Sequence, residues 1–418
     1  METPVLKKKI SELSKKKLLE RAEQYIFSTG LNDAASKLCR LNMRYGLAQM
    51  HIIQEKYGFE PNAYFISSPD ETISRNSYRW SSGYGYGGKI VWGTGKDKIV
   101  FLNTKPNHCG ILVGGLWECP DPYELIKNMN EIKSKELYID NILVNWDFDK
   151  SNHFISCFKT KSVSDLKIAP YVFLIHGSAP ELRGDKYGIG VYIDQSKNLQ
   201  DISIEEVTPF GTQSILLDKG AEDYLILNNE VLEFSNKKRE IVAKELFKMK
   251  FEIICNQPHQ FLKDYNSIYL GSNCTDPSSP LIKSNIFPIG LRADLQAYLF
   301  KGNQNLSEKT IKKLDLYEKA QKLGLMEELT KANILPHGAG YSFPDIKDVI
   351  QVLEYKDQRY FVCNLNKEKK GKKQRLKIVR YVSDLQFEYR RNEIIQKTVD
   401  MGLGKIMVKL KPLFSLKA

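Results

Sequence analysis

The sequence lacks the features that mark secreted and membrane proteins. Its seven cysteines are odd in number and none lies in a CxxC pair, so neither a disulfide framework nor a zinc ribbon is expected. The first residues contain no apolar stretch like that of a signal peptide, and no run elsewhere is long enough to cross a bilayer. We therefore expect a cytoplasmic protein with no membrane partner.

Internal repeats and Pro/Ser-rich linkers are also missing, which argues against a chain of independent domains. Apolar residues recur at helical spacing from about Ile10 to Tyr57 and are interrupted near residues 28–30, which predicts two helices. Beyond them, short β-rich runs alternate with helical stretches. We predict a mixed α+β fold, in which a helical N-terminal region (1–60) belongs to the same unit as a catalytic domain (61–418) with sheets around a central cleft.

The pattern beyond residue 60 predicts particular elements. Helices are expected at about 123–135, 237–248, 307–332 and 392–401, where SEKT at 307–310 is typical of a helix cap. Strands are expected, among other places, at 98–103, 110–116, 169–177, 188–193, 213–217, 223–227, 250–256, 359–365 and 375–383.

Positive charge exceeds negative charge by 12. A surplus of this size favours a polyanionic partner such as nucleic acid, because each neutralised phosphate releases counterions. Much of the excess lies in two tracts, residues 7–21 and 367–375. Such tracts are more often solvated faces or mobile loops than binding sites, so charge alone leaves both interpretations open.

Histidine is scarce, and four of the six histidines lie in unusual local settings: His108 in NHCG, His153 in NHF, His176 in IHGS and His337 in PHGAG. Strand ends and glycine-rich turns present reactive side chains, because the turn exposes a group that the strand holds rigidly. Cys109, His153 and His176 together offer one thiolate and two imidazoles, the ligands that a borderline divalent ion prefers. Each could instead be an ordinary buried thiol or a hydrogen-bonded turn histidine, and PHGAG around His337 could be only a tight turn.

Taken in order, several segments resemble motifs of the RtcB family of RNA-splicing ligases. Four segments in the first half resemble family motifs, shown in parentheses: GYGYGGKIVWG at 83–93 (GYGxPIGG), NHCGILV at 107–113 (DxxCG), SNHFI at 151–155 (GNHFxE) and FLIHGSAPELRG at 173–184 (HxGSRG). Three follow in the next part of the chain: IICNQPH at 253–259 (an HN metal motif), FPIGLRADLQAYLFKG at 287–302 (PGSMGxxSYxxxG) and ILPHGAG at 334–340 (CHGAGR). The last two are EYRRNEII at 388–395 (AYKxxxxVI) and GLGKIMVKLKPLFSLKA at 402–418 (LxPLxxxKG).

This resemblance implies a GTP- and Mn²⁺-dependent ligase that joins RNA 3′-phosphate or 2′,3′-cyclic phosphate ends to 5′-hydroxyl ends, in tRNA splicing or RNA repair. It implies RNA partners such as tRNA halves or broken ends, and an archease-type activating protein. Cys109, His153 and His176 would bind one Mn²⁺, and His337 would carry the guanylyl group. Asn152 would contact the GMP phosphate, while Tyr389 and Lys417 would line the guanine pocket.

Other positions depart from the family pattern. Where the family has a metal-binding aspartate this chain has Pro106, and the histidine of the HN motif corresponds to Cys255, with His259 as a substitute. One metal site is thus expected to persist and a second to be eroded. The family's glutamate, arginine and serine also fall on different residue types, at Ser156, Tyr341 and Leu291.

These departures keep two alternatives beside the active ligase. One is a diverged relative that binds nucleotide or RNA ends without ligating them, and the other is a metal-dependent hydrolase that uses the Cys/His cluster. For Tyr389 and Lys417, simple packing and solvation are the competing interpretations.

Overall fold

The computed structural model describes residues 9–148, 150, 152–304, 306–356, 358–366 and 375–417. Helices and several separate sheets are combined in it, so the predicted mixed α+β fold is confirmed. The basic turn predicted at 367–375 lies almost wholly outside the described residues. Within the described ranges, no helix has the length and apolar character needed to traverse a membrane.

Helices occur from one end of the described chain to the other. They are α1 (Lys15–Gln24), α2 (Ala34–Lys56), α3 (Ser77–Ser81), α4 (Pro122–Ser134), α5 (Lys197–Ile202), α6 (Asp218–Phe247), α7 (Glu308–Lys313), α8 (Tyr317–Lys322), α9 (Met326–Thr330) and α10 (Glu393–Asp400).

Two larger sheets organise the strands. One has the order β1 (Ile26–Phe27), β2 (Tyr64–Ile73), β3 (Gly85–Val91), β14 (Ser267–Leu270) and β13 (Gln260–Asp264). The other has the order β12 (Phe251–Pro258), β5 (Gly110–Leu116), β9 (Tyr171–Gly177), β8 (Phe154–Ser162), β24 (Gly404–Leu416), β17 (Ala297–Gly302) and β16 (Ile286–Ile289).

Smaller sheets complete the architecture. Two have three strands, with orders β10 (Ile204–Thr208), β11 (Gly211–Leu217), β4 (Ile99–Phe101) and β20 (Ile346–Tyr355), β21 (Gln358–Leu365), β22 (Leu376–Val379). The two-stranded pairs are β15 (Ser272–Cys274) with β18 (Ile334–Pro336), β19 (Tyr341–Ser342) with β23 (Glu388–Tyr389), and β6 (Tyr138–Ile139) with β7 (Ile142–Leu143).

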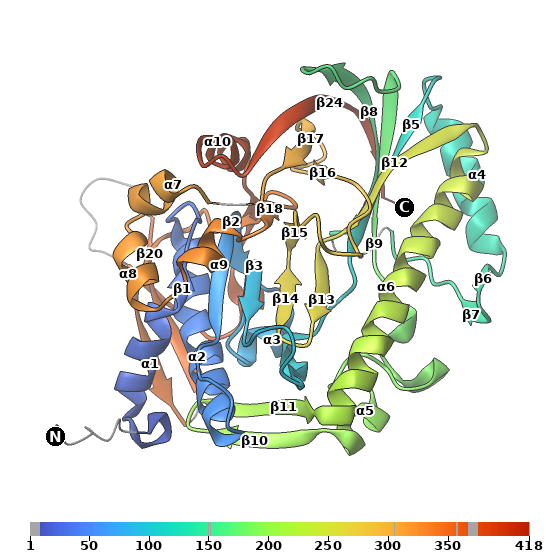
Figure 1. Ribbon diagram of the computed structural model, residues 1–418. Coiled ribbons are helices and arrows are strands. Elements are labelled where there is room, and N and C mark those ends of the chain that lie inside the picture. Colours follow the sequence, from blue (N-terminus) through green and yellow to red (C-terminus); the bar gives the residue numbers. More distant parts are fainter. Residues whose placement is uncertain are drawn as a thin grey trace.

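The seven-stranded sheet is buried on both faces. Because side chains alternate along a strand, β9 directs Phe173 and Ile175 to one face and Val172, Leu174 and His176 to the other. Helices α4 and α6 cover the first face, and Figure 1 shows them on the opposite side of the molecule from α1 and α2. The second face forms an apolar cluster of its own.

The two edge strands of this sheet approach each other. Gln257 on β12 donates from Nε2 to the backbone oxygens of Ser284 and Ile286, at 2.6 and 3.5 Å, where β16 begins. The sheet therefore curls, and its second face becomes concave.

The N-terminal helices α1 and α2 pack into the main core. The side chains of Ser14 and Asp33 cap α1 and α2 by accepting bonds from the backbone N–H groups of Lys17 and Ser36. One apolar cluster includes Leu18 at one end of the chain and Leu403 near the other. The described residues of this region, 9–60, therefore contribute to the same core as the remainder.

Three predictions about local structure are wrong. The segment 223–227, predicted as a strand, lies inside α6, which begins well before the expected residue 237. A short apolar run is compatible with either a strand or a helix. Over a longer stretch, Ala221, Tyr224, Asn228 and Val231 are buried at helical spacing, which identifies the segment as helix.

Residues 188–193, also predicted as a strand, are irregular, with Gly188 at φ 113°. The predicted helix at 307–332 is broken into α7, α8 and α9, because Asp315 and Gly324 adopt positive φ angles of 56° and 69°. Its predicted cap is confirmed, since the Ser307 side chain accepts from the backbone N–H of Thr310.

Candidate active site

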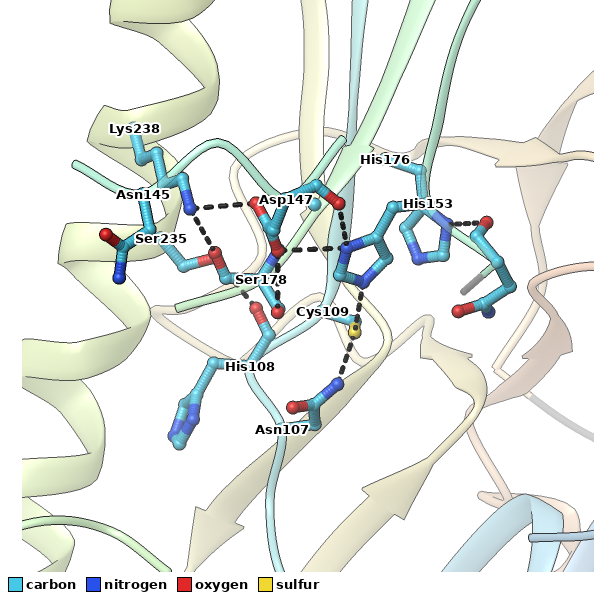
Figure 2. Close-up of polar contacts among 12 residues, drawn as sticks. Asn107, His108, Cys109, Asn145, Asp147, His153, His176, Ser178, Ser235 and Lys238 are labelled. Carbon is cyan, nitrogen blue, oxygen red and sulfur yellow. Dashed lines mark hydrogen bonds and ion pairs between the residues drawn. The ribbon is translucent and has the colours of Figure 1, made fainter. Parts of the chain in front are cut away.

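Cys109, His153 and His176 converge at one end of the seven-stranded sheet. Their ligand atoms lie within 4.8 Å of one another, with Cys109 Sγ 3.4 Å from His153 Nε2, and all three side chains are buried. Strand pairing brings them together, because His176 on β9 is paired with Ile111 of β5 on one side and with Phe154 of β8 on the other. Cys109 and His153 directly precede these strands. Figure 2 shows the resulting cluster.

Both imidazoles are held in the tautomer that a metal ligand needs. His153 Nδ1 lies 2.9 Å from a carboxylate oxygen of Asp147 and 3.0 Å from its backbone oxygen, and His176 Nδ1 lies 3.0 Å from the backbone oxygen of Asn152. In each ring Nδ1 is therefore the donor, which leaves the Nε2 lone pair for the cluster.

A buried ion-pair network supports His153 from behind (Figure 2). Lys238 of α6 donates to Asp147 and to Glu181, each at 2.8 Å, and all three side chains are buried. Burial would raise the pKa of Asp147, but His153 and Lys238 outweigh it and hold that pKa well below its usual range. The carboxylate therefore stays ionised behind the ring.

The two histidines of the cluster differ in charge. Burial would lower the pKa of His153, but the facing Cys109 sulfur and the Asp147 carboxylate raise it to about 9. Burial, together with the neighbouring His153 and His337, lowers the pKa of His176 well below its ordinary value. His176 is thus neutral, whereas His153 keeps a proton on Nε2 facing the Cys109 sulfur, and a metal ion bound there would displace that proton.

A second chain of hydrogen bonds holds Cys109. Asn107 donates from Nδ2 to Cys109 Sγ at 2.8 Å, and Arg183 donates to Asn107 Oδ1 at 2.6 Å. His108, which lies between Asn107 and Cys109 in the sequence, adopts a positive φ of 56° and forms a hydrogen bond with Asn228 through Nε2. This turn aims Cys109 at the cluster while the His108 ring is engaged by α6.

His259 and His337 extend the cluster. His259 Nε2 lies 3.2 Å from His176 Nε2, and the ring centroids of His259 and His337 are 4.5 Å apart at 30°. The backbone N–H of His259 donates to the backbone oxygen of Cys109, which ties β13 to the metal end of β5. Four histidines and one cysteine, separated widely in sequence, therefore lie in one group.

Asp70 orients His337. Its carboxylate lies 2.8 Å from His337 Nδ1 and also accepts from the backbone N–H groups of His337 and Gly338, at 3.3 and 3.4 Å. No described residue hydrogen-bonds Nε2 of His337. Gly340 is required nearby, because it has φ 64° and a Cβ there would lie 2.4 Å from the backbone oxygen of Asp70.

A cavity of about 1000 Å³ opens onto this group of histidines. It lies between the concave face of the seven-stranded sheet and the ends of β2, β3 and β13 in the five-stranded sheet. Asp147 is the acidic residue among its described lining, and the basic ones are Arg75, Arg79, Lys150, Arg183, Arg292 and Lys417. Low-dielectric walls concentrate such a field, so the cavity favours an anionic ligand.

The other predicted site residues are placed unequally. Asn152, His337, Tyr389 and Lys417 all line the cavity. Cys255 does not reach the cluster, so its assignment as a ligand is wrong: it pairs with Val113, four residues along β5 from Cys109, or about 13 Å. Its thiol lies instead in the apolar cluster of the concave face, where burial raises its pKa.

The positions that depart from the expected motifs remain without the expected donors. Pro106 offers no ligand atom, and the Ser156 hydroxyl bonds the Ser415 hydroxyl at 2.6 Å beside the cavity. Leu291 and Tyr341 also line the cavity. His259, by contrast, is brought to the cluster.

Sequence reasoning missed Asp70, Asp147 and Lys238. Asp70 lies in the ten-residue strand β2, of which every residue is buried, so an acidic pair inside a strand was a signal. Asp147 is close in sequence to His153, whereas Lys238 falls on an ordinary charged helix. Only packing reveals its role.

Neither a scan against protein-family models nor a search among curated proteins found a match for this chain. The site is thus characterised by its geometry: an oriented histidine lies beside a cluster of cysteine and histidine side chains, at a cavity lined mainly by basic charges.

Proposed function

We propose that the chain is a GTP- and Mn²⁺-dependent RNA ligase of the RtcB type that acts in the cytoplasm. It joins RNA 3′-phosphate or 2′,3′-cyclic phosphate ends to 5′-hydroxyl ends, in tRNA splicing or RNA repair. One observation carries the proposal: His337, oriented by Asp70, lines the same cavity as His153 and His176, the two histidines that converge with Cys109.

His337 is the nucleophile in this scheme. The Asp70 carboxylate holds the proton on Nδ1, so the lone pair on Nε2 attacks the α-phosphorus of GTP. An Nε2–P bond forms, the bond from the α-phosphorus to the bridging oxygen breaks, and pyrophosphate leaves with that oxygen. Asp70 stabilises the positive charge that develops on the ring.

Cys109, His153 and His176 are the residues that would hold the metal ion. One thiolate and two imidazoles with inward Nε2 atoms fit a borderline divalent cation, and Mn²⁺ is named on the resemblance. When bound, the ion neutralises phosphate charge and polarises the phosphoryl oxygens. For a second ion, His259 is the donor that remains near the cluster.

The cationic cavity supports a nucleotide and an RNA end as ligands. Asn152 is proposed to contact the GMP phosphate, and Tyr389 and Lys417 the guanine base. The RNA partners are tRNA halves or broken ends, and an archease-type protein is the proposed activator. These last assignments depend on the resemblance in sequence.

The test is incubation of the full-length protein with α-labelled GTP and Mn²⁺, followed by denaturing electrophoresis. We expect a labelled band that His337→Ala abolishes. His51→Gln is the matched control, because His51 bonds the backbone oxygen of Ala63 within the α2 core and does not line the cavity. Absence of label in the folded wild type across several divalent metals would refute the proposal.

A relative that binds RNA ends without joining them is the second candidate. It is favoured by Ser156, which offers a hydroxyl bonded to Ser415 at a cavity position where the family has a carboxylate. RNA binding without joining of any combination of ends would support this alternative. Sealing of a 3′-phosphate to a 5′-hydroxyl end would rule it out.

A further inference from the structure

Three aromatic rings gather beside the loop that bears His337. Tyr341, Phe387 and Tyr389 come from β19 and from the segment at β23, and these two strands pair antiparallel. The ring of Phe387 meets those of Tyr341 and Tyr389 edge to face, with centroids 4.8 and 5.9 Å apart at 72° and 90°. Edge-to-face packing fixes the rings and keeps their flat faces out of mutual stacking.

Arg75 lies over this aromatic group. Its guanidinium carbon is 4.2 Å from the centroid of Phe387 and 5.9 Å from that of Tyr341, and the side chain is exposed where β2 leads into α3. No described carboxylate forms an ion pair with it, although Arg292 in the same cavity wall binds Asp294 through two hydrogen bonds. Arg75 is thus held by aromatic stacking, and its charge stays available.

This combination has a characteristic ligand. A planar guanidinium or an aromatic face stacks on nucleobases, and such platforms bind single-stranded nucleic acid with little sequence preference. A lysine in the same place would supply charge but no plane. Arg75 and Tyr341 both line the cavity, whose other basic residues suit a phosphate backbone.

The position relative to His337 is also informative. Arg75 follows Asp70, whose carboxylate orients His337, by five residues, so their Cα atoms are at most about 18 Å apart. Tyr341 follows His337 by four residues, and its backbone oxygen accepts from the Thr72 hydroxyl on β2. The platform and the proposed nucleophile are therefore both anchored to β2, through Thr72 and Asp70.

We propose that Arg75, Phe387 and Tyr341 form a stacking platform for a nucleobase near the end of a single-stranded RNA, directly beside the guanine pocket assigned to Tyr389 and Lys417. The inference depends on the proposed function, because the ligand is the RNA whose end reaches His337. The platform positions this end and takes no part in bond making.

The test uses the full-length protein and an oligoribonucleotide with a 3′-phosphate and 2-aminopurine near that end, without GTP. Stacking quenches the fluorescence of 2-aminopurine on binding. We expect Arg75→Ala and Arg75→Lys to weaken binding about tenfold and to lose the quenching, as is typical for loss of one base stack. Phe387→Leu, which removes the ring beneath the guanidinium, should act in the same direction.

Arg380→Lys is the matched control, since the Arg380 guanidinium also lies over an aromatic ring, 4.6 Å from the centroid of Tyr381, but does not line the cavity. We expect it to keep the quenching, and thermal melting checks that every variant is folded. Quenching and affinity retained in Arg75→Lys would show a phosphate contact through charge and overturn the platform. So would unchanged binding by Arg75→Ala, or a probe that the wild type binds without quenching.

The same experiments separate this inference from the proposed function. Normal quenching together with no labelling of His337 by GTP would refute the ligase proposal and support the stacking platform. Labelling of His337 together with quenching that is unchanged in the Arg75 variants would refute the platform and leave the ligase proposal standing.

Discussion

Two carboxylate–histidine pairs serve the cavity, and they are built differently. Asp147 shares its charge with Lys238 behind His153, and the far side of that ring faces the Cys109 sulfur. Asp70 lies against backbone N–H groups and the Ser68 hydroxyl, and no described cation pairs with it.

The difference separates two tasks that one residue pair can perform. A charge-compensated carboxylate with a ring turned toward sulfur holds a metal ligand in place. A carboxylate without a counter-cation increases the nucleophilicity of an imidazole whose Nε2 remains unbonded, as catalysis by that nitrogen requires. The comparison predicts that equivalent substitutions at the two carboxylates affect different steps.

The largest effect is expected for Asp70→Asn. An amide cannot stabilise the charge that develops on His337, and it can impose the wrong tautomer on the ring. We expect guanylylation to slow by roughly 10²–10⁴-fold with metal binding unchanged, as measured by single-turnover labelling and by metal titration. Loss of metal binding in this variant would contradict the division of tasks.

Lys238→Met tests the buried side of the comparison. It leaves Asp147 and Glu181 buried without their cation, and removing one partner of a buried pair costs about 3–5 kcal/mol of unfolding free energy. Chemical denaturation measures the change. The adjacent Lys237→Met is the control, because the Lys237 side chain is 45% exposed and solvent screens its ion pairs, so this variant should unfold like the wild type.

Asp147→Asn should act on the metal. Loss of the carboxylate behind His153 is expected to weaken divalent-ion affinity by about 10–100-fold, as is typical for the groups that orient metal ligands. Isothermal titration with Mn²⁺ and Zn²⁺ measures it. If Mn²⁺ binds this variant as tightly as the wild type, His153 is not a ligand held by Asp147.

Asp33→Asn gives the smallest expected change, and it probes the support of Asp70. Arg390 binds Asp33 through two hydrogen bonds of 2.7 Å and donates to the backbone oxygen of Glu71, next to Asp70. Burial opposes ionisation of Asp33, but Arg390 and the Ser36 N–H lower its pKa. We expect a loss of about 1–2 kcal/mol near neutral pH.

The sign of the pH dependence follows from that lowered pKa. Stability from Asp33 is fully present above its unfolded pKa of about 3.9 and is lost as pH falls through the lower folded value. The difference between wild type and Asp33→Asn should therefore shrink as pH drops below about 4 in urea unfolding. A difference that stays constant would assign the effect to the cap of α2 alone.

By itself, the sequence determined the α+β class, the two N-terminal helices and the residue types of the cluster, because periodicity and turn chemistry are local. It also named His337, Cys109, His153 and His176. It misjudged Cys255, because strand register, which motif order does not reveal, carries that thiol about 13 Å from Cys109.

Only the tertiary structure decided which partners these residues have. Asp70 is 267 positions from His337, and Lys238 is 91 positions from Asp147. No local pattern links such residues, since their meeting depends on the pairing of strands and on α6 packing across the sheet. The residue types determine the chemistry of the ligands, and long-range packing determines the distances and charges through which they act together.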